Sequence, residues 1–376
     1  SICTTFGGKD VTSVIIPAGL REIPDYAFDK CNALTSVTFK ENSKLTNIGV
    51  SAFKGCSNLM SFDVPNGVTS IGNSAFANCS NLQRISIPNT VISISNSAFN
   101  KCSALTSITI PATVVDIGKN AFKGCANLES ISVSENNKIY KGEGNCIIEK
   151  ASGKLLFGCK GSIIPANVTI IENEAFSGCN GLTKINIPNG VTTIGEYAFE
   201  GCVGLTSLVI PSSVMTVKNG SFSGCSNLTS VDIQSNLTSI GTRMFQNCTA
   251  LTEIEIPNSV NIINFSAFEG CEKLTTAVLP ANVTTIGQNA FSGCSALKDF
   301  VIPSSVESIG SAAFAGCTAN NFVIPASVNV IGANAFGPKY PIGPKLKVYC
   351  EAESQPSGWN SKRYKHCDVV WGYVAD

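Results

Sequence analysis

The sequence predicts a β-rich solenoid, in which short parallel strands stack coil upon coil along one continuous interior. The main observation is a phrase centred on phenylalanine that recurs thirteen times, mostly at steps of 23 residues. A fixed period between 20 and 50 residues is typical of stacked repeats. A proline recurs with the same period and agrees with it. The recurring phenylalanines are Phe28, Phe53, Phe76, Phe99, Phe122, Phe176, Phe199, Phe222, Phe245, Phe268, Phe291, Phe314 and Phe336.

The first element of each coil is a short strand. In the repeat LTSITIPATVVDIGKNAFKGCAN (105–127), Leu105, Ile108 and Ile110 have the spacing of inward-facing residues. Pro111 then ends the strand, because it has no N–H to give to a ladder of hydrogen bonds.

The rest of the coil alternates apolar pairs with turns. Val114 and Ile117 predict a second short strand, and Gly118 permits the turn that follows. Phe122 fills the interior, and Cys125 closes the coil before the next leucine. One coil cannot bury both of its faces, so we expect about 13 coils to form a single solenoid over residues 1–336.

Two regions depart from the period. Residues 131–175 form a long repeat, for which we expect a hairpin of CIIE and KLLFG around Ser152 and Gly153. That hairpin either bulges from the stack or serves as an irregular coil. Residues 337–376 do not repeat and hold both tryptophans, so we expect a C-terminal cap over the last strand edge.

Twelve of the seventeen cysteines follow a periodic phenylalanine by three residues. Their Cβ atoms would stack about 5 Å apart, beyond the usual distance for a disulfide, so we expect a ladder of free buried thiols. Five cysteines lie outside it, of which Cys3 has no suggested partner. Cys146 with Cys159, and Cys350 with Cys367, either form disulfides or remain unpaired.

Several classes of function find no support. Acidic and basic residues number 26 each, which argues against nucleic acid as a partner, and no apolar run is long enough to insert into a membrane. The single histidine, His366, has no catalytic motif around it, and no C-x-x-C string suggests a metal. We therefore expect no enzyme, no cofactor and no metal.

The outward positions of the first strands carry mostly small hydroxyl side chains, with one exception. Three acidic residues on two successive coils are followed by an apolar stripe, a combination that suggests a partner-binding patch. The alternative is that the acids are merely solvated and that valine suits a strand. The six residues are Asp232, Glu253, Glu255, Val278, Val301 and Val323.

The repeat resembles the BspA-type leucine-rich repeat, L-x-x-I-x-I-P-x-x-V-x-x-I-G-x-x-A-F-x-x-C, over residues 11–336. Departures are the long repeat, Met244 before Phe245, and Lys339 in place of the last cysteine. The resemblance implies a right-handed leucine-rich repeat coil stack. It also implies a secreted or surface-attached bacterial protein that binds host matrix, host cells or bacterial surface proteins. It transfers no binding residues.

The leading hypothesis is therefore a monomeric, non-enzymatic adhesion module at the cell surface or outside the cell, which binds proteins through its strand-lined face. The first residues, SICTTFGGKD, lack the pattern of a signal peptide, and we expect neither a signal peptide nor an anchor in this chain. The alternative is a carbohydrate-binding surface module. It would require the cap aromatics Tyr349, Trp359, Trp371 and Tyr373 to be exposed and coplanar, whereas we expect them to be buried.

Overall fold

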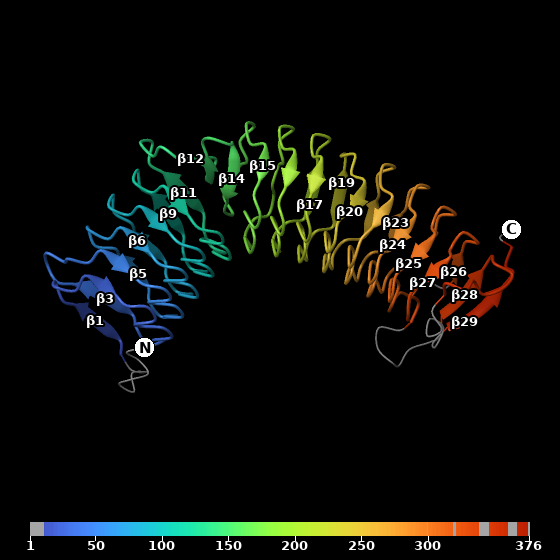
Figure 1. The fold of residues 1–376 in the computed structure, drawn as a ribbon, viewed down its shortest axis with the longest axis horizontal. Coiled ribbons are helices and arrows are strands. Elements are labelled where there is room, and N and C mark those ends of the chain that lie inside the picture. Colours follow the sequence, from blue (N-terminus) through green and yellow to red (C-terminus); the bar gives the residue numbers. More distant parts are fainter. Residues whose placement is uncertain (1–10, 299, 319–320, 338–345, 360–366, 375–376) are drawn as a thin grey trace. The chain divides into compact units, whose positions relative to one another are not determined.

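The structure is a computed structural model that describes residues 11–298, 300–318, 321–337, 346–359 and 367–374. Within these residues it contains strands and turns but no helix. The chain divides into two compact units, residues 1–183 and 184–376. Within each unit, short strands and turns follow one another coil by coil (Figure 1). Each unit is a parallel β-solenoid, which confirms the predicted fold class.

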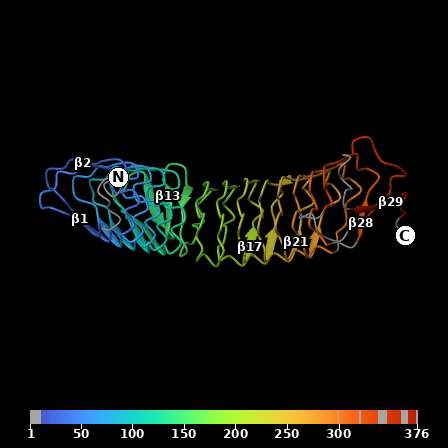
Figure 2. The same ribbon diagram turned by 90° about the horizontal axis from the view of Figure 1, so that it is seen from below.

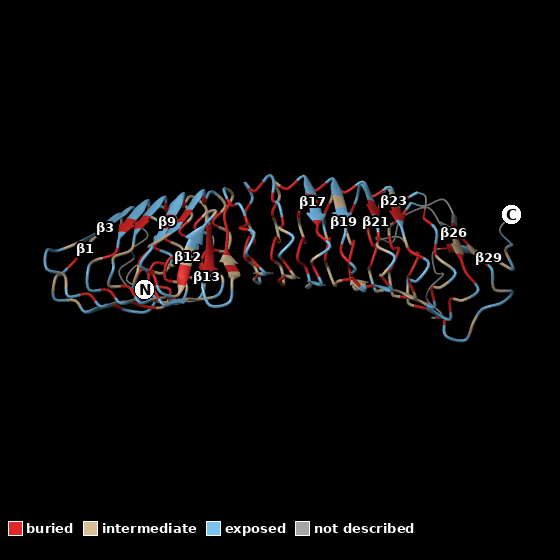
Figure 3. Cartoon of the chain, turned by 90° about the horizontal axis from the view of Figure 1, so that it is seen from above, coloured by how far each residue is buried: buried red, intermediate tan, exposed pale blue. Residues whose placement is uncertain are grey.

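The first strand of each coil in unit 1 follows the predicted alternation. In β9, Ser107 and Thr109 are exposed while Ile108 and Ile110 are buried. Successive coils pair in parallel and in register, so that Ser107 lies opposite Ser130. The outward face of these strands is exposed and the inward face is buried (Figure 3). These strands are β1 (Ser13–Ile16), β3 (Ser36–Phe39), β5 (Ser61–Asp63), β7 (Arg84–Ser86), β9 (Ser107–Ile110) and β11 (Ser130–Val133).

The second apolar pair of each coil also forms a strand, as predicted. In unit 1 these two-residue strands build one parallel sheet in the order β10-β8-β6-β4-β2, in which Ile71 lies opposite Ile94. Each contributes one isoleucine to the interior. They are β2 (Glu22–Ile23), β4 (Asn47–Ile48), β6 (Ser70–Ile71), β8 (Ser93–Ile94) and β10 (Asp116–Ile117).

The phenylalanine turn forms the third side of the coil. Its backbone is hydrogen-bonded to the next coil, as where Phe76 N donates to Ala98 O at 2.8 Å. The rings stack coil on coil, with Phe53 and Phe76 centroids 5.4 Å apart and 9° from parallel. The turn passes through the left-handed region at two residues, for example at Ser97 (φ 56°) and Lys101 (φ 59°). This is why glycine and asparagine are frequent there.

Gly118 shows how closely successive coils approach one another. A Cβ atom added to Gly118 would lie 2.3 Å from the backbone nitrogen of Asn96. The glycine of the I-G pair therefore leaves room for the backbone of the preceding coil.

The long repeat contains the predicted hairpin and one strand that the sequence did not suggest. β13 (Cys146–Glu149) pairs antiparallel with β14 (Lys154–Phe157) around Gly153, which has a φ of 70°. The additional strand β12 (Tyr140–Glu143) pairs with β13 through a tight turn at Gly144 and Asn145. Both turn residues have positive φ, as a type I′ hairpin requires.

Of the two alternatives for this hairpin, the structure shows the irregular coil. β14 pairs in parallel with β15 (Ile170–Ile171), so it takes the place of a second strand. The Phe157 ring lies 5.4 Å from that of Phe122, edge to face, and so continues the aromatic interior. Asn137 is fully buried at the start of this coil and fixes its path by four hydrogen bonds to backbone groups.

Unit 2 repeats the same coil, as the view from below shows (Figure 2). Its second strands form the parallel pair β16–β18 and the parallel sheet β20-β22-β24-β25-β27. The first strands are β17 (Ser207–Ile210), β19 (Ser230–Ile233), β21 (Glu253–Glu255), β23 (Thr276–Val278), β26 (Asn321–Ile324), β28 (Leu346–Cys350) and β29 (Cys367–Trp371). The second strands are β16 (Thr193–Ile194), β18 (Thr216–Val217), β20 (Ser239–Ile240), β22 (Ile262–Ile263), β24 (Thr285–Ile286), β25 (Ser308–Ile309) and β27 (Val330–Ile331).

The tail continues the coils although its sequence does not repeat. β28 and β29 extend the first-strand sheet in parallel, with Phe322, Val348 and Val369 in one row. Trp359 forms a bridge to Ile331, next in line to the second strands, and its indole donates to Val328 O at 2.9 Å. The separate cap over residues 337–376 stays a prediction.

The periodic cysteines are buried and stacked, and with one exception they remain thiols without a disulfide. Most of these S–H groups donate to the carbonyl of the phenylalanine in the preceding coil, as from Cys102 to Phe76 at 3.1 Å. Cys179, which follows the long repeat, donates instead to Gly158 O at 3.6 Å. The exception is Cys31, which is disulfide-bonded, so the prediction of twelve free thiols is wrong at this position. Cys3 and Lys339 lie outside the described residues.

Neither suggested disulfide among the remaining cysteines is formed, since none of the four is disulfide-bonded. Cys367 lies opposite Leu346, while Cys350 lies opposite Trp371. The two are therefore offset by four residues along parallel strands, on the order of 13 Å. Cys367 instead donates to Phe336 O at 3.2 Å and so occupies the position of a ladder cysteine.

Candidate functional site

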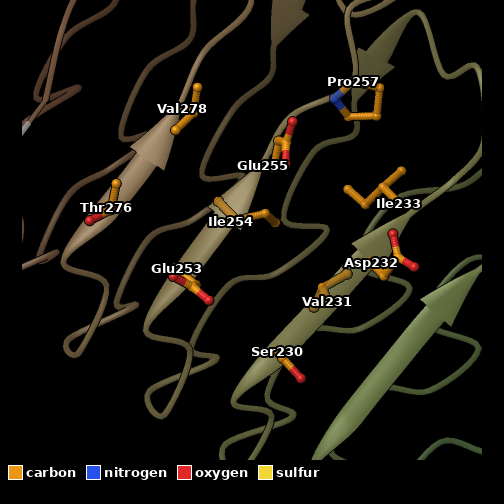
Figure 4. Close-up of a pocket in the computed structure, with 10 residues that line it drawn as sticks. All are labelled: Ser230, Val231, Asp232, Ile233, Glu253, Ile254, Glu255, Pro257, Thr276 and Val278. Atoms are coloured by element: carbon orange, nitrogen blue, oxygen red, sulfur yellow. The ribbon is translucent and has the colours of Figure 1, made fainter.

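The strand-lined face of unit 2 contains a groove with a volume of about 520 Å³ across β19, β21 and β23 (Figure 4). Four of the six residues predicted for a binding patch line it. The groove residues are Ser230, Val231, Asp232, Ile233, Glu253, Ile254, Glu255, Pro257, Thr276 and Val278.

Three carboxylates stand on the outward side of two successive coils. Glu253 and Glu255 project from the same face of β21, and Asp232 projects from the neighbouring β19 (Figure 4). Asp232 accepts a hydrogen bond from the Gln234 side chain at 2.7 Å. Neither glutamate side chain has a hydrogen bond or an ion pair within the described part of the chain. The groove thus presents negative charge that the described residues leave largely uncompensated.

Apolar side chains line the groove beside these carboxylates. Ile254 is only 3% exposed, Ile233 is half-buried, and Val278 is 56% exposed at the next coil. β19 and β21 belong to different two-stranded sheets, β17–β19 and β21–β23, and the groove lies where these sheets meet. The arrangement therefore combines charge with exposed apolar surface.

The apolar stripe is only partly continuous with the groove. Val301 is 80% exposed but is not assigned to a strand and does not line the groove. Val323 is half-buried and lies opposite Tyr349 of β28. Sequence reasoning missed Ile233, Ile254 and Pro257. The one available signal was Gln234, which stands where most repeats have proline.

The chemistry of the described residues is that of a binding surface. No group of three His, Cys, Asp or Glu side chains among them is placed to hold a metal ion. Burial raises the pKa of thiols such as Cys125 and Cys271 to about 12, which keeps them protonated at neutral pH. His366 lies outside the described residues. Among the described residues there is no helix that is long and apolar enough to cross a membrane.

The cap aromatics do not form a flat exposed platform. Trp359 is 5% exposed, whereas Tyr349, Trp371 and Tyr373 are half-buried. The rings of Trp359 and Trp371 are tilted by 33°, and those of Tyr349 and Tyr373 by 50°. Burial is thus confirmed fully for Trp359 alone, and the arrangement does not favour the carbohydrate alternative.

Comparison with known proteins points to one repeat family. The family described as BspA type leucine rich repeat region matches residues 3–129, 158–275 and 225–341. A search of curated proteins finds no match.

Similar solved structures include leucine-rich repeat proteins of three bacteria. A leucine-rich repeat protein from Eubacterium ventriosum is 27% identical over 78% of this chain and 85% of its own, with a TM-score of 0.65. A leucine rich cell surface protein from Faecalibacterium prausnitzii is 30% identical over 76% and 78%, with a TM-score of 0.56. A leucine-rich repeat protein from Bacteroides ovatus is 28% identical over 96% and 91%, with a TM-score of 0.61.

Proposed function

Because this chain belongs to the BspA-type leucine-rich repeat family, we propose that it is a non-enzymatic adhesion module that acts outside the cell or at its surface. Its partners are proteins of a host or of neighbouring bacteria. The similarity to a bacterial leucine rich cell surface protein supports this location. Leucine-rich repeat coils provide a protein-interaction type of fold, since stacked strands create an extended binding surface.

The observation that carries the proposal is the outward face of the first strands. Serine, threonine and other short side chains line most of it, so a partner backbone can approach closely. Among the described residues, the groove with three carboxylates and exposed valine stands out from this polar background. A solvated strand face with a locally apolar groove favours protein recognition over catalysis.

The test measures binding of the purified chain to immobilised matrix proteins and to intact bacteria, before and after protease treatment of the target. We expect saturable binding that protease abolishes. Arginine introduced at two exposed strand positions, Ser107→Arg in unit 1 and Ser207→Arg in unit 2, blocks the face. At least one of these variants should bind at least about tenfold more weakly.

The matched control is Glu272→Arg, which places the same side chain at an exposed position outside the strands. It should bind like the unmodified chain. Binding that survives protease treatment of the target, or that both strand variants retain in full, would contradict the proposal. So would the absence of saturable binding to every protein-bearing surface.

A further inference from the structure

We propose that the groove across β19, β21 and β23 binds an extended segment of a partner protein that carries arginine or lysine side chains. This rests on the proposed function only in taking the partner to be a protein, and it adds the chemistry that the partner must have. Three features of the described residues carry it: the arrangement of charge, the apolar lining, and an equivalent position in unit 1 that shows the missing partner.

The first feature is the crowding of like charges. Asp232 of β19 and Glu255 of β21 occupy equivalent outward positions on successive coils, and both line the groove. Like charges that line one groove repel each other. The fold does not require them, since the same position holds Ser86, Thr109 or Val278 in other coils. A cation bound between them would relieve the repulsion.

The second feature is the equivalent position in unit 1. There Arg84 Nη1 lies 2.6 Å from Asp63 Oδ1, and Nη2 contacts the other carboxylate oxygen at 3.3 Å. Arg84 follows Asp63 by 21 residues, and Glu253 follows Asp232 by the same interval. Unit 1 thus supplies its own guanidinium, whereas unit 2 has a carboxylate in its place. The structure therefore contains a template for the cation that a partner would bring.

The third feature is the apolar lining. Lysine and arginine side chains carry an aliphatic stem that favours apolar contacts while the charged head stays with its counter-ions. The half-buried Pro257 and the exposed Val278 offer such contacts beside the carboxylates. A small hydrated metal ion would gain nothing from them, which favours a peptide side chain as the occupant. An arginine would also match a carboxylate with two hydrogen bonds.

The decisive variant is Glu253→Arg, because it should pair with Asp232 in cis as Arg84 pairs with Asp63. The probes are immobilised decapeptides in which serine alternates with arginine, lysine or glutamate, measured at low and at 0.5 M salt. We expect the arginine and lysine peptides to bind the unmodified chain and the glutamate peptide not to bind. High salt should weaken binding, since it screens exposed charges.

In Glu253→Arg, binding of the arginine peptide should fall at least tenfold while the melting temperature is retained. Glu253→Gln with Glu255→Gln should also weaken it, and Val278→Ser should weaken it with all charges kept. The matched control is Glu307→Gln, an exposed acid outside the groove, which should bind unchanged.

Arginine-peptide binding that is unchanged in Glu253→Arg, or reduced equally in Glu307→Gln, overturns the assignment of the groove. Failure of the basic peptides to bind at all overturns it as well. Neither result bears on the proposed adhesion, because that is judged by Ser107→Arg, Ser207→Arg and protein-bearing surfaces.

Discussion

In most coils the phenylalanine carbonyl accepts two hydrogen bonds. Phe76 O receives the backbone N–H of Cys79 at 3.1 Å and the S–H of Cys102, from the next coil, also at 3.1 Å. A carbonyl oxygen has two lone pairs, and in a dry interior an unused one is costly. This explains why the corner holds cysteine: alanine would fill part of the space without donating, and a longer apolar residue would not fit.

The buried thiols predict that the protein loses stability in alkali. Burial raises the pKa of Cys125 and Cys271 to about 12 in the folded protein, whereas an unfolded thiol ionises near pH 9. Their contribution is therefore complete below pH 9 and is lost as pH rises toward 12. Each thiol should lower the free energy of unfolding by roughly 1.4 kcal/mol per pH unit within that window.

Urea unfolding at several pH values between 8 and 10.5 measures this effect. Cys271→Ala is the matched comparison, because it lacks one of the buried thiols. Its free energy of unfolding should therefore fall less steeply with pH, and the difference in slope is the contribution of that thiol. Equal slopes for the two proteins, or stability that does not change over this range, would show that the thiols are not insulated from solvent.

At the scale of elements, residues 131–175 show how a coil of different length fits a stack of regular ones. Asn137 Nδ2 donates to Pro111 O at 2.8 Å and to Val114 O at 2.9 Å. Its Oδ1 accepts from the backbone of Ile139 and Tyr140 at 2.9 and 2.8 Å. One side chain thus satisfies backbone groups of the preceding coil and starts β12. The insertion is held by polar pairing where the other coils use an apolar residue.

Replacing Asn137 should therefore destabilise this coil strongly. Asn137→Asp keeps the shape and the acceptors but loses both donors and buries a charge, so we expect a loss of about 3 kcal/mol or more. Urea unfolding gives the magnitude, and limited proteolysis should show earlier cleavage within residues 138–157. Asn167→Ala, at an exposed asparagine in the same repeat, should change stability by less than about 0.5 kcal/mol. Similar losses for both variants would contradict this role.

At the scale of the whole molecule, the repeats act as interchangeable units within a stack. In unit 2, Phe222 stacks on Phe199 at 5.4 Å and on Phe245 at 5.7 Å, with the rings nearly parallel in both pairs. Because each coil contacts mainly its neighbours, stability is close to a sum over coils and their interfaces. We therefore expect the stack to tolerate the loss of a whole coil, but not the loss of part of a coil, which would place unlike positions on top of one another.

Deletion of residues 205–227 tests this property. It removes one complete period, so that Leu228 takes the place of Leu205 and Phe245 stacks on Phe199. We expect the shortened protein to keep its far-UV circular dichroism per residue and to melt within a few degrees of the full chain. Deletion of residues 205–215, about half a period, should abolish cooperative melting. If the two deletions behave alike, the coils are not independent units.

The sequence alone determined the coil. Its period, its two strands and its inward residues follow from local spacing, because in a solenoid the contacts of Leu105 or Ile117 are made to the same positions one period away. The hairpin at 146–157 was predicted for a similar reason, since a tight turn between two apolar strands is a local signal. The acidic residues at 232, 253 and 255 were found because repeats can be compared position by position.

The tertiary structure decided the features that depend on contacts without a period. The tail strands β28 and β29 pair with the parallel sheet although their sequence does not match the repeat. Cys367 occupies the position of a ladder thiol only because the chain returns to Phe336. The disulfide of Cys31 was likewise not predicted, because the period places Cys31 among the ladder thiols. The groove exists because the sheets β17–β19 and β21–β23 meet beside the carboxylates. Such features depend on how neighbouring strands meet in space, and one-dimensional spacing does not encode this.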